Sequence, residues 1–142
     1  MKYLIIALLA FSTFFYSCNP AQKNKNTTTS QTQINKEVKV GVYYFHAKRK
    51  CATCVAVGNG AKLVVEEKFA DKNVKFYDIS IEDEANKKIV DHFKATGSSL
   101  YILSNNKDKE TIENFSSTAF NKAMLNPNEY KEELANKIKS KL

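Results

Sequence analysis

Two cysteines separated by two residues, Cys51 and Cys54, are the side chains in this sequence best suited to chemistry. A continuous apolar run over residues 42–45 precedes them, and an apolar-periodic segment begins at Val55, so Cys51 is expected where a helix begins. Two thiols at a helix start can close a disulfide within one turn and open it again. The unpaired backbone N–H groups of that turn also favour the thiolate form of Cys51.

A cationic turn lies directly before this pair. Lys48, Arg49 and Lys50 precede Cys51, and their positive charge is expected to lower the pKa of its thiol. His46 lies five residues before Cys51 and is a further group that can polarise the thiol. The sequence leaves open that His46 is only a turn residue and that the three cations form a solvated turn.

Two other roles for the cysteine pair have to be weighed. A structural disulfide is one, but so short a spacing closes a tiny loop and removes little entropy from the unfolded chain. A metal site is the other, since two thiolates and His46 supply three ligands for a soft ion such as Zn²⁺ or Cu⁺. No second pair of cysteines or histidines completes such a site. We therefore predict a thiol–disulfide site at Cys51 and Cys54, without a cofactor or a metal.

The first 17 residues are typical of an export signal. A basic start at Lys2 is followed by an apolar run over residues 4–16, too short for a comfortable membrane span. The next two residues, Ser17-Cys18, resemble the lipobox of bacterial lipoproteins, in which a peptidase cuts before a cysteine that carries lipid. The preceding Phe15-Tyr16 departs from the commonest lipobox, which leaves open an ordinary signal peptide or a retained anchor. We predict a lipoprotein signal peptide over 1–17 and lipidation of Cys18.

Export has consequences for location and for chemistry. The predicted protein is anchored to the bacterial cell envelope through lipid on Cys18 and faces the periplasm or the exterior. Disulfides persist outside the cytoplasm, so Cys51 and Cys54 are expected to oxidise there unless something reduces them. A reductant or oxidant partner is therefore implied by the compartment.

Composition divides the rest of the chain into a tether and one domain. Residues 18–37 are rich in Asn, Gln, Thr and Lys and are too polar to form a core, so they are predicted to be a disordered tether. The folded domain is expected over 38–142.

The net charge of +7 has to be counted separately for the N-terminal segment and for the domain. Four of the 22 lysines and arginines precede Glu37, the first of the 15 acidic residues, so the net charge from Glu37 onward is +3. Basic residues are spread among acidic ones there, which argues against nucleic acid as a partner.

Hydrophobic periodicity predicts an α/β domain with a four-stranded mixed sheet flanked by helices. The main elements follow the order βαβαββα, so right-handed crossovers make the first two strands parallel neighbours with a hairpin on the other side. Gly58 and Gly60 favour a kink in the first helix, although its apolar stripe should keep it helical. The expected elements are strand 38–45, helix 51–70, strand 74–79, a helix from 80–84 to a stop at Gly97, strands 100–103 and 111–115, a short helix 119–125 and a last helix from Pro127.

A buried strand ending in aromatic residues, a CxxC pair at a helix start and this element order resemble the thioredoxin-like family. The resemblance covers about residues 38–142 and implies a thioredoxin-like fold. It implies that Cys51 is the attacking thiol and Cys54 the resolving one, with protein thiols or disulfides as substrates.

The sequence departs from the family at two positions. The family's cis-proline falls within residues 97–100, where Ser99 takes its place, so the resemblance puts the substrate edge at Ser98 and Ser99. The family's buried acid in the first strand falls at about Tyr44. An alternative function stays open, namely a non-catalytic binding module or redox sensor that holds a thiophilic metal or a partner protein.

Overall fold

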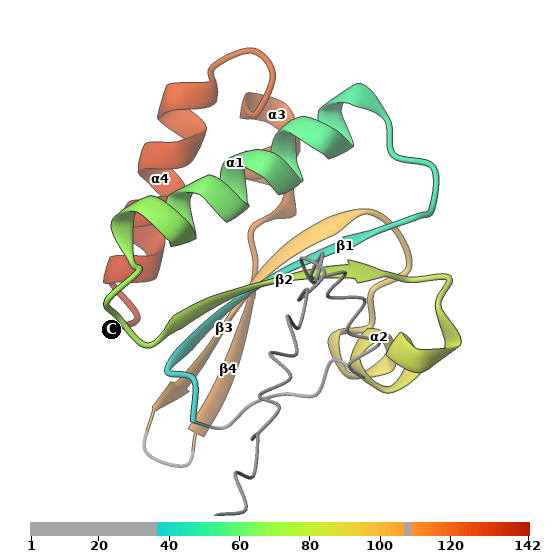
Figure 1. Ribbon diagram of the computed structural model, residues 1–142, viewed down its shortest axis with the longest axis horizontal. Helices are drawn as coiled ribbons and strands as arrows, with labels where there is room; N and C mark the ends of the chain where they lie inside the picture. The colour runs from blue at the N-terminus through green and yellow to red at the C-terminus, as the bar shows by residue number, and fades with distance from the viewer. Residues whose placement is uncertain (1–36, 107–108) are drawn as a thin grey trace, which may run out of the picture.

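The structure, a computed structural model, describes residues 37–106 and 109–142 as an α/β domain. The predicted signal peptide, Cys18 and the tether up to residue 36 lie outside the described residues. The strands and helices of the domain follow one another as β1 (Val40–His46), α1 (Ala52–Lys68), β2 (Val74–Ser80), a 3₁₀ turn (Glu84–Asn86), α2 (Lys87–Phe93), β3 (Ser99–Asn106), β4 (Lys109–Asn114), α3 (Ser116–Lys122) and α4 (Pro127–Lys139) (Figure 1).

The four strands form one mixed sheet in the order β2-β1-β3-β4. β1 runs parallel to β2, with Val40 opposite Val74, and antiparallel to β3, with Phe45 opposite Ser99. β3 and β4 form an antiparallel hairpin. The predicted four-stranded mixed sheet is confirmed, with its parallel first pair and with the hairpin on the other side.

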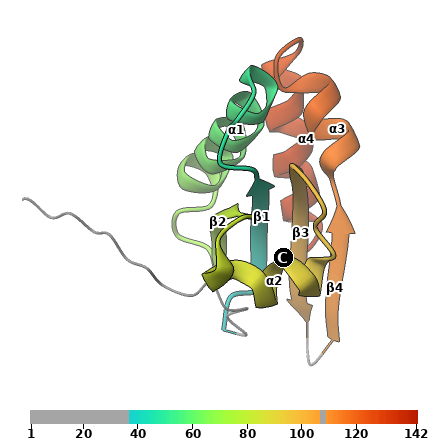
Figure 2. The same ribbon diagram turned by 90° about the vertical axis from the view of Figure 1, so that its right-hand side faces the viewer.

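Helices cover both faces of this sheet. α1, α3 and α4 lie on one face and α2 lies on the other (Figures 1 and 2). Successive side chains of a strand point to opposite faces, so Val42 and Tyr44 pack under α1 whereas Tyr43 and Phe45 pack against α2. Every residue of β1 is buried, which confirms that the strand before the cysteine pair is a buried one.

α1 runs unbroken through Gly58 and Gly60. A Cβ atom on Gly58 would lie 2.6 Å from a ring carbon of Tyr44, and one on Gly60 would lie 2.6 Å from a ring carbon of Tyr130. Both glycines therefore provide space for a tyrosine ring against the helix, and the expected kink does not occur.

α2 is shorter than the sequence predicts, and the expected stop at Gly97 is wrong. The helix ends at Phe93 because Lys94 adopts the left-handed conformation, with φ 52° and ψ 40°. The N–H of Ala95 then donates to the carbonyl of Val90 at 3.0 Å. This cap buries the Ala95 side chain in the α2 face of the core, and that contact offsets the strain of a left-handed lysine.

The C-terminal part adds α3 to the predicted main order. α3 begins at Ser116, earlier than the expected residue 119, because the Asn114 side chain accepts a hydrogen bond from the Ser116 N–H at 2.9 Å. Pro127 is the first residue of α4, as predicted. Within residues 37–106 and 109–142, no helix has both the length and the apolar character needed to cross a membrane.

Replacing Gly58 by alanine tests the contact between α1 and β1. Alanine favours a helix interior by about 1 kcal/mol over glycine, but its methyl group would overlap the buried Tyr44 ring. Overpacking of this kind costs about 1–3 kcal/mol, so we expect Gly58→Ala to lower the free energy of unfolding measured in urea. The exposed neighbour supplies the control, because Asn59→Ala changes only helix propensity. A Gly58→Ala protein as stable as Asn59→Ala would contradict the contact.

Candidate functional site

The Cys51–Cys54 pair lies at the N-terminal end of α1, beside the carboxyl end of β1 (Figure 1). Cys51 is the N-cap residue, with extended backbone at φ −75° and ψ 167°, and its Sγ accepts a hydrogen bond from the Cys54 N–H at 3.2 Å. The two cysteines are paired as a disulfide, with their Cα atoms 5.0 Å apart. The predicted position of Cys51 at the helix start is confirmed.

The two sulfur-bearing residues differ in access to solvent. Cys51 is exposed, whereas Cys54 is only 7% exposed and packs on the inner face of α1. An incoming thiol or disulfide can therefore reach the Cys51 sulfur and not the Cys54 sulfur. The cap hydrogen bond would also stabilise negative charge on the Cys51 sulfur after reduction.

A tyrosine from β1 fixes the turn that carries Cys54. The hydroxyl of Tyr44 donates to the Cys54 carbonyl at 2.7 Å. Burial, with the charge of Asp78 adding to it, raises the pKa of Tyr44 to about 12, so this phenol stays protonated and can donate throughout the physiological range. One turn further on, Tyr130 of α4 donates to the Val57 carbonyl at 2.9 Å.

The cationic turn divides into one paired lysine and two free cations. Lys50 Nζ lies 3.2 Å from Asp78 Oδ2 and 5.5 Å from the centre of the Tyr44 ring. Lys48 and Arg49 are exposed, and neither forms an ion pair with any residue in the part of the chain that the structure describes. The effect of these charges on the Cys51 thiol stays a prediction.

His46 makes its contacts away from the cysteines. Its Nε2 lies 2.7 Å from Asp78 Oδ1, and its Nδ1 lies 2.8 Å from the carbonyl oxygen of Ala47. Both ring nitrogens are thus engaged by Asp78 and Ala47, so neither is left to form a hydrogen bond with Cys51.

Ser98, directly before β3, and Ser99, the first residue of β3, occupy different positions relative to Cys54. Ser98 is exposed, and its Oγ lies 3.8 Å from Cys54 Sγ. Ser99 is buried, pairs with Phe45 in the sheet, and donates its hydroxyl to the Gly97 carbonyl at 3.0 Å. The structure therefore brings Ser98 to the cysteine pair, whereas the Ser99 side chain completes the local turn.

The sequence did not predict two features near the cysteines, namely the carboxylate of Asp78 and the apolar pair Met124 and Leu125. Asp78 is the shared partner of His46 and Lys50. Met124 lies beside Thr53 of the CxxC turn, since the Thr53 hydroxyl donates to its sulfur at 3.2 Å. A signal for the second feature was present, because Met124 and Leu125 are large apolar residues directly before the Asn126-Pro127 helix start, where a polar turn is usual.

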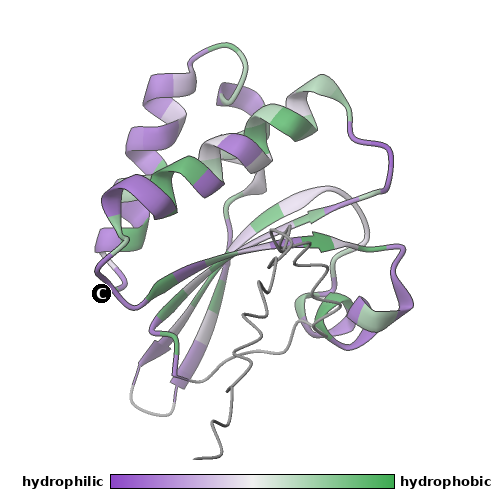
Figure 3. Cartoon of the chain, in the orientation of Figure 1, coloured by the Kyte–Doolittle hydropathy of each residue, from purple (hydrophilic) through white to green (hydrophobic). Residues whose placement is uncertain are grey.

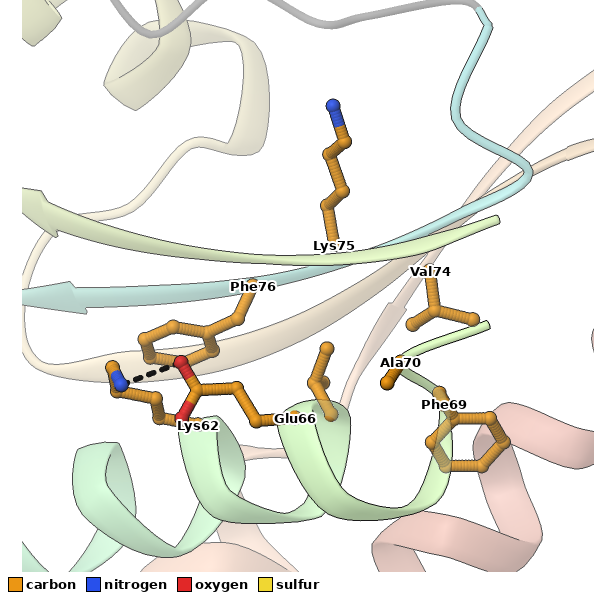
Figure 4. Close-up of a pocket in the computed structure, with 8 residues that line it drawn as sticks. Lys62, Glu66, Phe69, Ala70, Val74, Lys75 and Phe76 are labelled. Atoms are coloured by element: carbon orange, nitrogen blue, oxygen red, sulfur yellow. Dashed lines mark hydrogen bonds and ion pairs between the residues drawn. The ribbon is translucent and has the colours of Figure 1, made fainter. Parts of the chain in front are cut away.

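No group of three or more His, Cys, Asp or Glu side chains placed to hold a metal ion is found among residues 37–106 and 109–142. A hollow of about 370 Å³ lies between β2 and the C-terminal half of α1 (Figure 4). Lys62 and Glu66 form an ion pair at its rim, 2.5 Å long, and Phe69 and Phe76 line it.

Tyr44→Phe removes the phenol hydrogen bond to the Cys54 carbonyl and keeps the ring. We expect the free energy of unfolding of the oxidised protein to fall by about 1 kcal/mol, the usual net value of one such bond. The Tyr44 pKa of about 12 in the folded state lies above the ordinary tyrosine value of 10.0, so the difference from wild type is constant below pH 10 and falls as the pH rises above 10, because the unfolded phenol ionises first. Urea unfolding at a series of pH values measures it.

Tyr130→Phe is the matched control, because it removes the same kind of bond from the Val57 carbonyl. Both variants should lose similar stability. Only Tyr44→Phe should change the rate at which a small thiol reduces the disulfide, because only the Tyr44 hydroxyl donates its hydrogen bond to a cysteine of that disulfide. An unchanged rate in Tyr44→Phe would show that this bond does not constrain the reactive turn.

Comparison with known proteins leaves this site to be interpreted from its own geometry. No protein-family model matches the chain, and no curated protein matches it. The geometry of the site consists of an exposed Cys51 and a buried partner, Cys54, one helical turn away.

Proposed function

We propose that this protein is a thioredoxin-like thiol–disulfide oxidoreductase that acts by disulfide exchange through Cys51 and Cys54. The observation that carries the proposal is the difference in access within one disulfide, since exposed Cys51 caps α1 and Cys54 is buried behind it. A disulfide that closes so small a loop adds little stability, so a structural role explains the pairing poorly. The order of the sheet and the helices on its two faces also fit the family's fold.

The exchange proceeds in two balanced steps. The Cys51 thiolate attacks one sulfur of a substrate disulfide, a mixed disulfide forms, and the other substrate sulfur leaves as a thiolate. The Cys54 sulfur, as thiolate, then attacks Cys51 Sγ, which restores the Cys51–Cys54 disulfide and releases the second substrate thiolate. Two electrons pass to the substrate, and the reverse sequence oxidises a substrate dithiol.

Cys54 has to lose its proton before the second step, and Tyr44 is poorly suited to accept it. Its hydroxyl already donates to the Cys54 carbonyl, and burial keeps it protonated. The Ser98 hydroxyl lies 3.8 Å from Cys54 Sγ, and Ser98 is itself exposed to solvent. The Cys54 proton therefore leaves toward water on the Ser98 side, because no carboxylate is buried among residues 37–106 and 109–142.

The site is proposed to work at the bacterial cell envelope. Lipid on Cys18 anchors the chain, residues 18–37 form the tether, and the domain faces the periplasm or the exterior. Protein thiols or disulfides are the substrates there. A separate reductant or oxidant resets the pair, since this environment keeps disulfides closed.

Substitution of each cysteine in the full-length chain, purified in detergent, tests the proposal. Wild type should reduce insulin through many turnovers with dithiothreitol as reductant. Cys51→Ser should fall to the background rate, because it lacks the accessible sulfur. Cys54→Ser should stop at a mixed disulfide on Cys51, which intact-protein mass spectrometry detects. Iodoacetamide should label Cys51 of the reduced protein with a pH midpoint below about 8.5, the value for a free cysteine.

The same assay separates the alternatives. A reversible Cys51–Cys54 disulfide without multiple turnovers identifies a redox sensor. No turnover in wild type, together with zinc binding that both serine variants lose, identifies a metal-holding module. Either result contradicts the proposed oxidoreductase.

A further inference from the structure

We propose that the turn joining α3 to α4, residues 123–126, acts with Lys48 and Arg49 to select protein substrates that carry a large apolar residue and acidic residues near the reactive cysteine. Residues 123–126 are called the apolar turn below. The inference rests on the proposed function and deepens it, because it names the class of substrate that Cys51 accepts.

The apolar turn presents hydrophobic side chains to solvent beside the cysteine pair. Met124 is 54% exposed and Leu125 is 81% exposed, and the turn has hydrophobic colours in Figure 3. The Thr53 hydroxyl contacts the Met124 sulfur at 3.2 Å, which joins the turn to one of the two residues between the cysteines. Neighbouring exposed hydrophobic side chains such as Met124 and Leu125 mark interaction sites.

A hollow of about 350 Å³ extends this surface between α1 and α4. Ala56 and Leu63 of α1 line one side, and Ala123, Pro127 and Tyr130 line the other. Its size is at the lower end of the range for ligand pockets, which suits one apolar side chain of an extended segment rather than a small-molecule cofactor. A substrate whose cysteine lies at Cys51 can thus place a nearby apolar residue on the apolar turn.

The two cations Lys48 and Arg49 account for the proposed preference for acidic substrate residues. Lys48 and Arg49 are exposed and without an ion pair among the described residues, whereas Lys50 is paired with Asp78. The first turn of α1 contains no acidic residue to oppose them. Acidic side chains of a substrate would neutralise these two cations, and basic ones would be repelled.

A second copy of this chain fits the surface less well. The net charge of +3 from Glu37 onward means that two domains repel each other weakly. A second copy would also need to present acidic residues to Lys48 and Arg49. An acidic segment with an apolar residue satisfies both halves of the surface at once.

Exchange with four synthetic peptide disulfides tests the selection. Each peptide has one cysteine, joined to a second copy, with either two aspartates or two lysines and either leucine or serine nearby. The reduced full-length chain in detergent is mixed with each peptide at low salt, and the second-order rate constant is divided by that for uncharged hydroxyethyl disulfide. Rates of Cys51→Ser are subtracted, which removes any reaction of Cys18. We expect the aspartate–leucine peptide to exceed the lysine–serine peptide at least tenfold.

Two double variants should each remove one half of the preference. Met124→Ser with Leu125→Ser should lower the advantage of leucine over serine about tenfold, as expected for a large apolar side chain that stays in water. Lys48→Glu with Arg49→Glu should reverse the preference for aspartate, and added salt should weaken the wild-type preference. Ile112→Ser on β4 and Lys88→Glu on α2 are the matched controls and should leave all ratios unchanged.

The outcomes distinguish the two proposals. Ratios that are equal for the four peptides, or double variants that behave like the controls, overturn the selection and leave the oxidoreductase intact. A dimer that Leu125→Ser converts to a monomer in sedimentation assigns the apolar turn to a second copy and also overturns the selection. A wild-type chain that reacts with neither hydroxyethyl disulfide nor any peptide overturns the proposed function itself.

Discussion

The close packing of Tyr44 against Gly58 is the contact on which the rest of the site depends. A side chain on Gly58 would overlap the ring, so the glycine allows α1 to lie directly on β1 at this point. The same ring places its hydroxyl on the carbonyl of Cys54, at the turn that carries the disulfide. Tyr130 repeats the arrangement at Gly60 and Val57. Two tyrosines from opposite sides thus hold the first two turns of α1 to the sheet and to α4.

This arrangement separates a fixed sulfur from an accessible one. Cys54 belongs to the buried stripe of α1 and is held through its carbonyl, whereas Cys51 precedes the helix and faces solvent. Charge follows the same division. Asp78 at the end of β2 engages His46 and Lys50 on the sheet side, and Lys48 and Arg49 stay free at the surface. The two cations of this turn that have no ion pair among the described residues are therefore Lys48 and Arg49.

Local sequence patterns predicted the fold well where one interaction decides the outcome. Apolar runs identified β1, β2 and β3, a hairpin turn indicated β4, and Pro127 marked the start of α4 because proline fits the first helical position. The end of α2 was predicted incorrectly, since Gly97 is a good local stop but burial of Ala95 favours a left-handed Lys94. Gly58 and Gly60 suggested a kink for a similar reason, because the partners that require glycine there are distant in sequence.

The sequence by itself determined the cysteine pair, its place at a helix start and the cations before it, because all three depend on residues that are neighbours in the chain. Only the tertiary structure decided which sulfur is buried, that Tyr44 holds the Cys54 turn, and that Asp78 takes the side chains of His46 and Lys50. It alone brought Ser98 and Met124 to the cysteines. Hydrogen bonds and ring packing between residues far apart in the chain are set by the crossing of β1, α1 and α4, which no local pattern encodes.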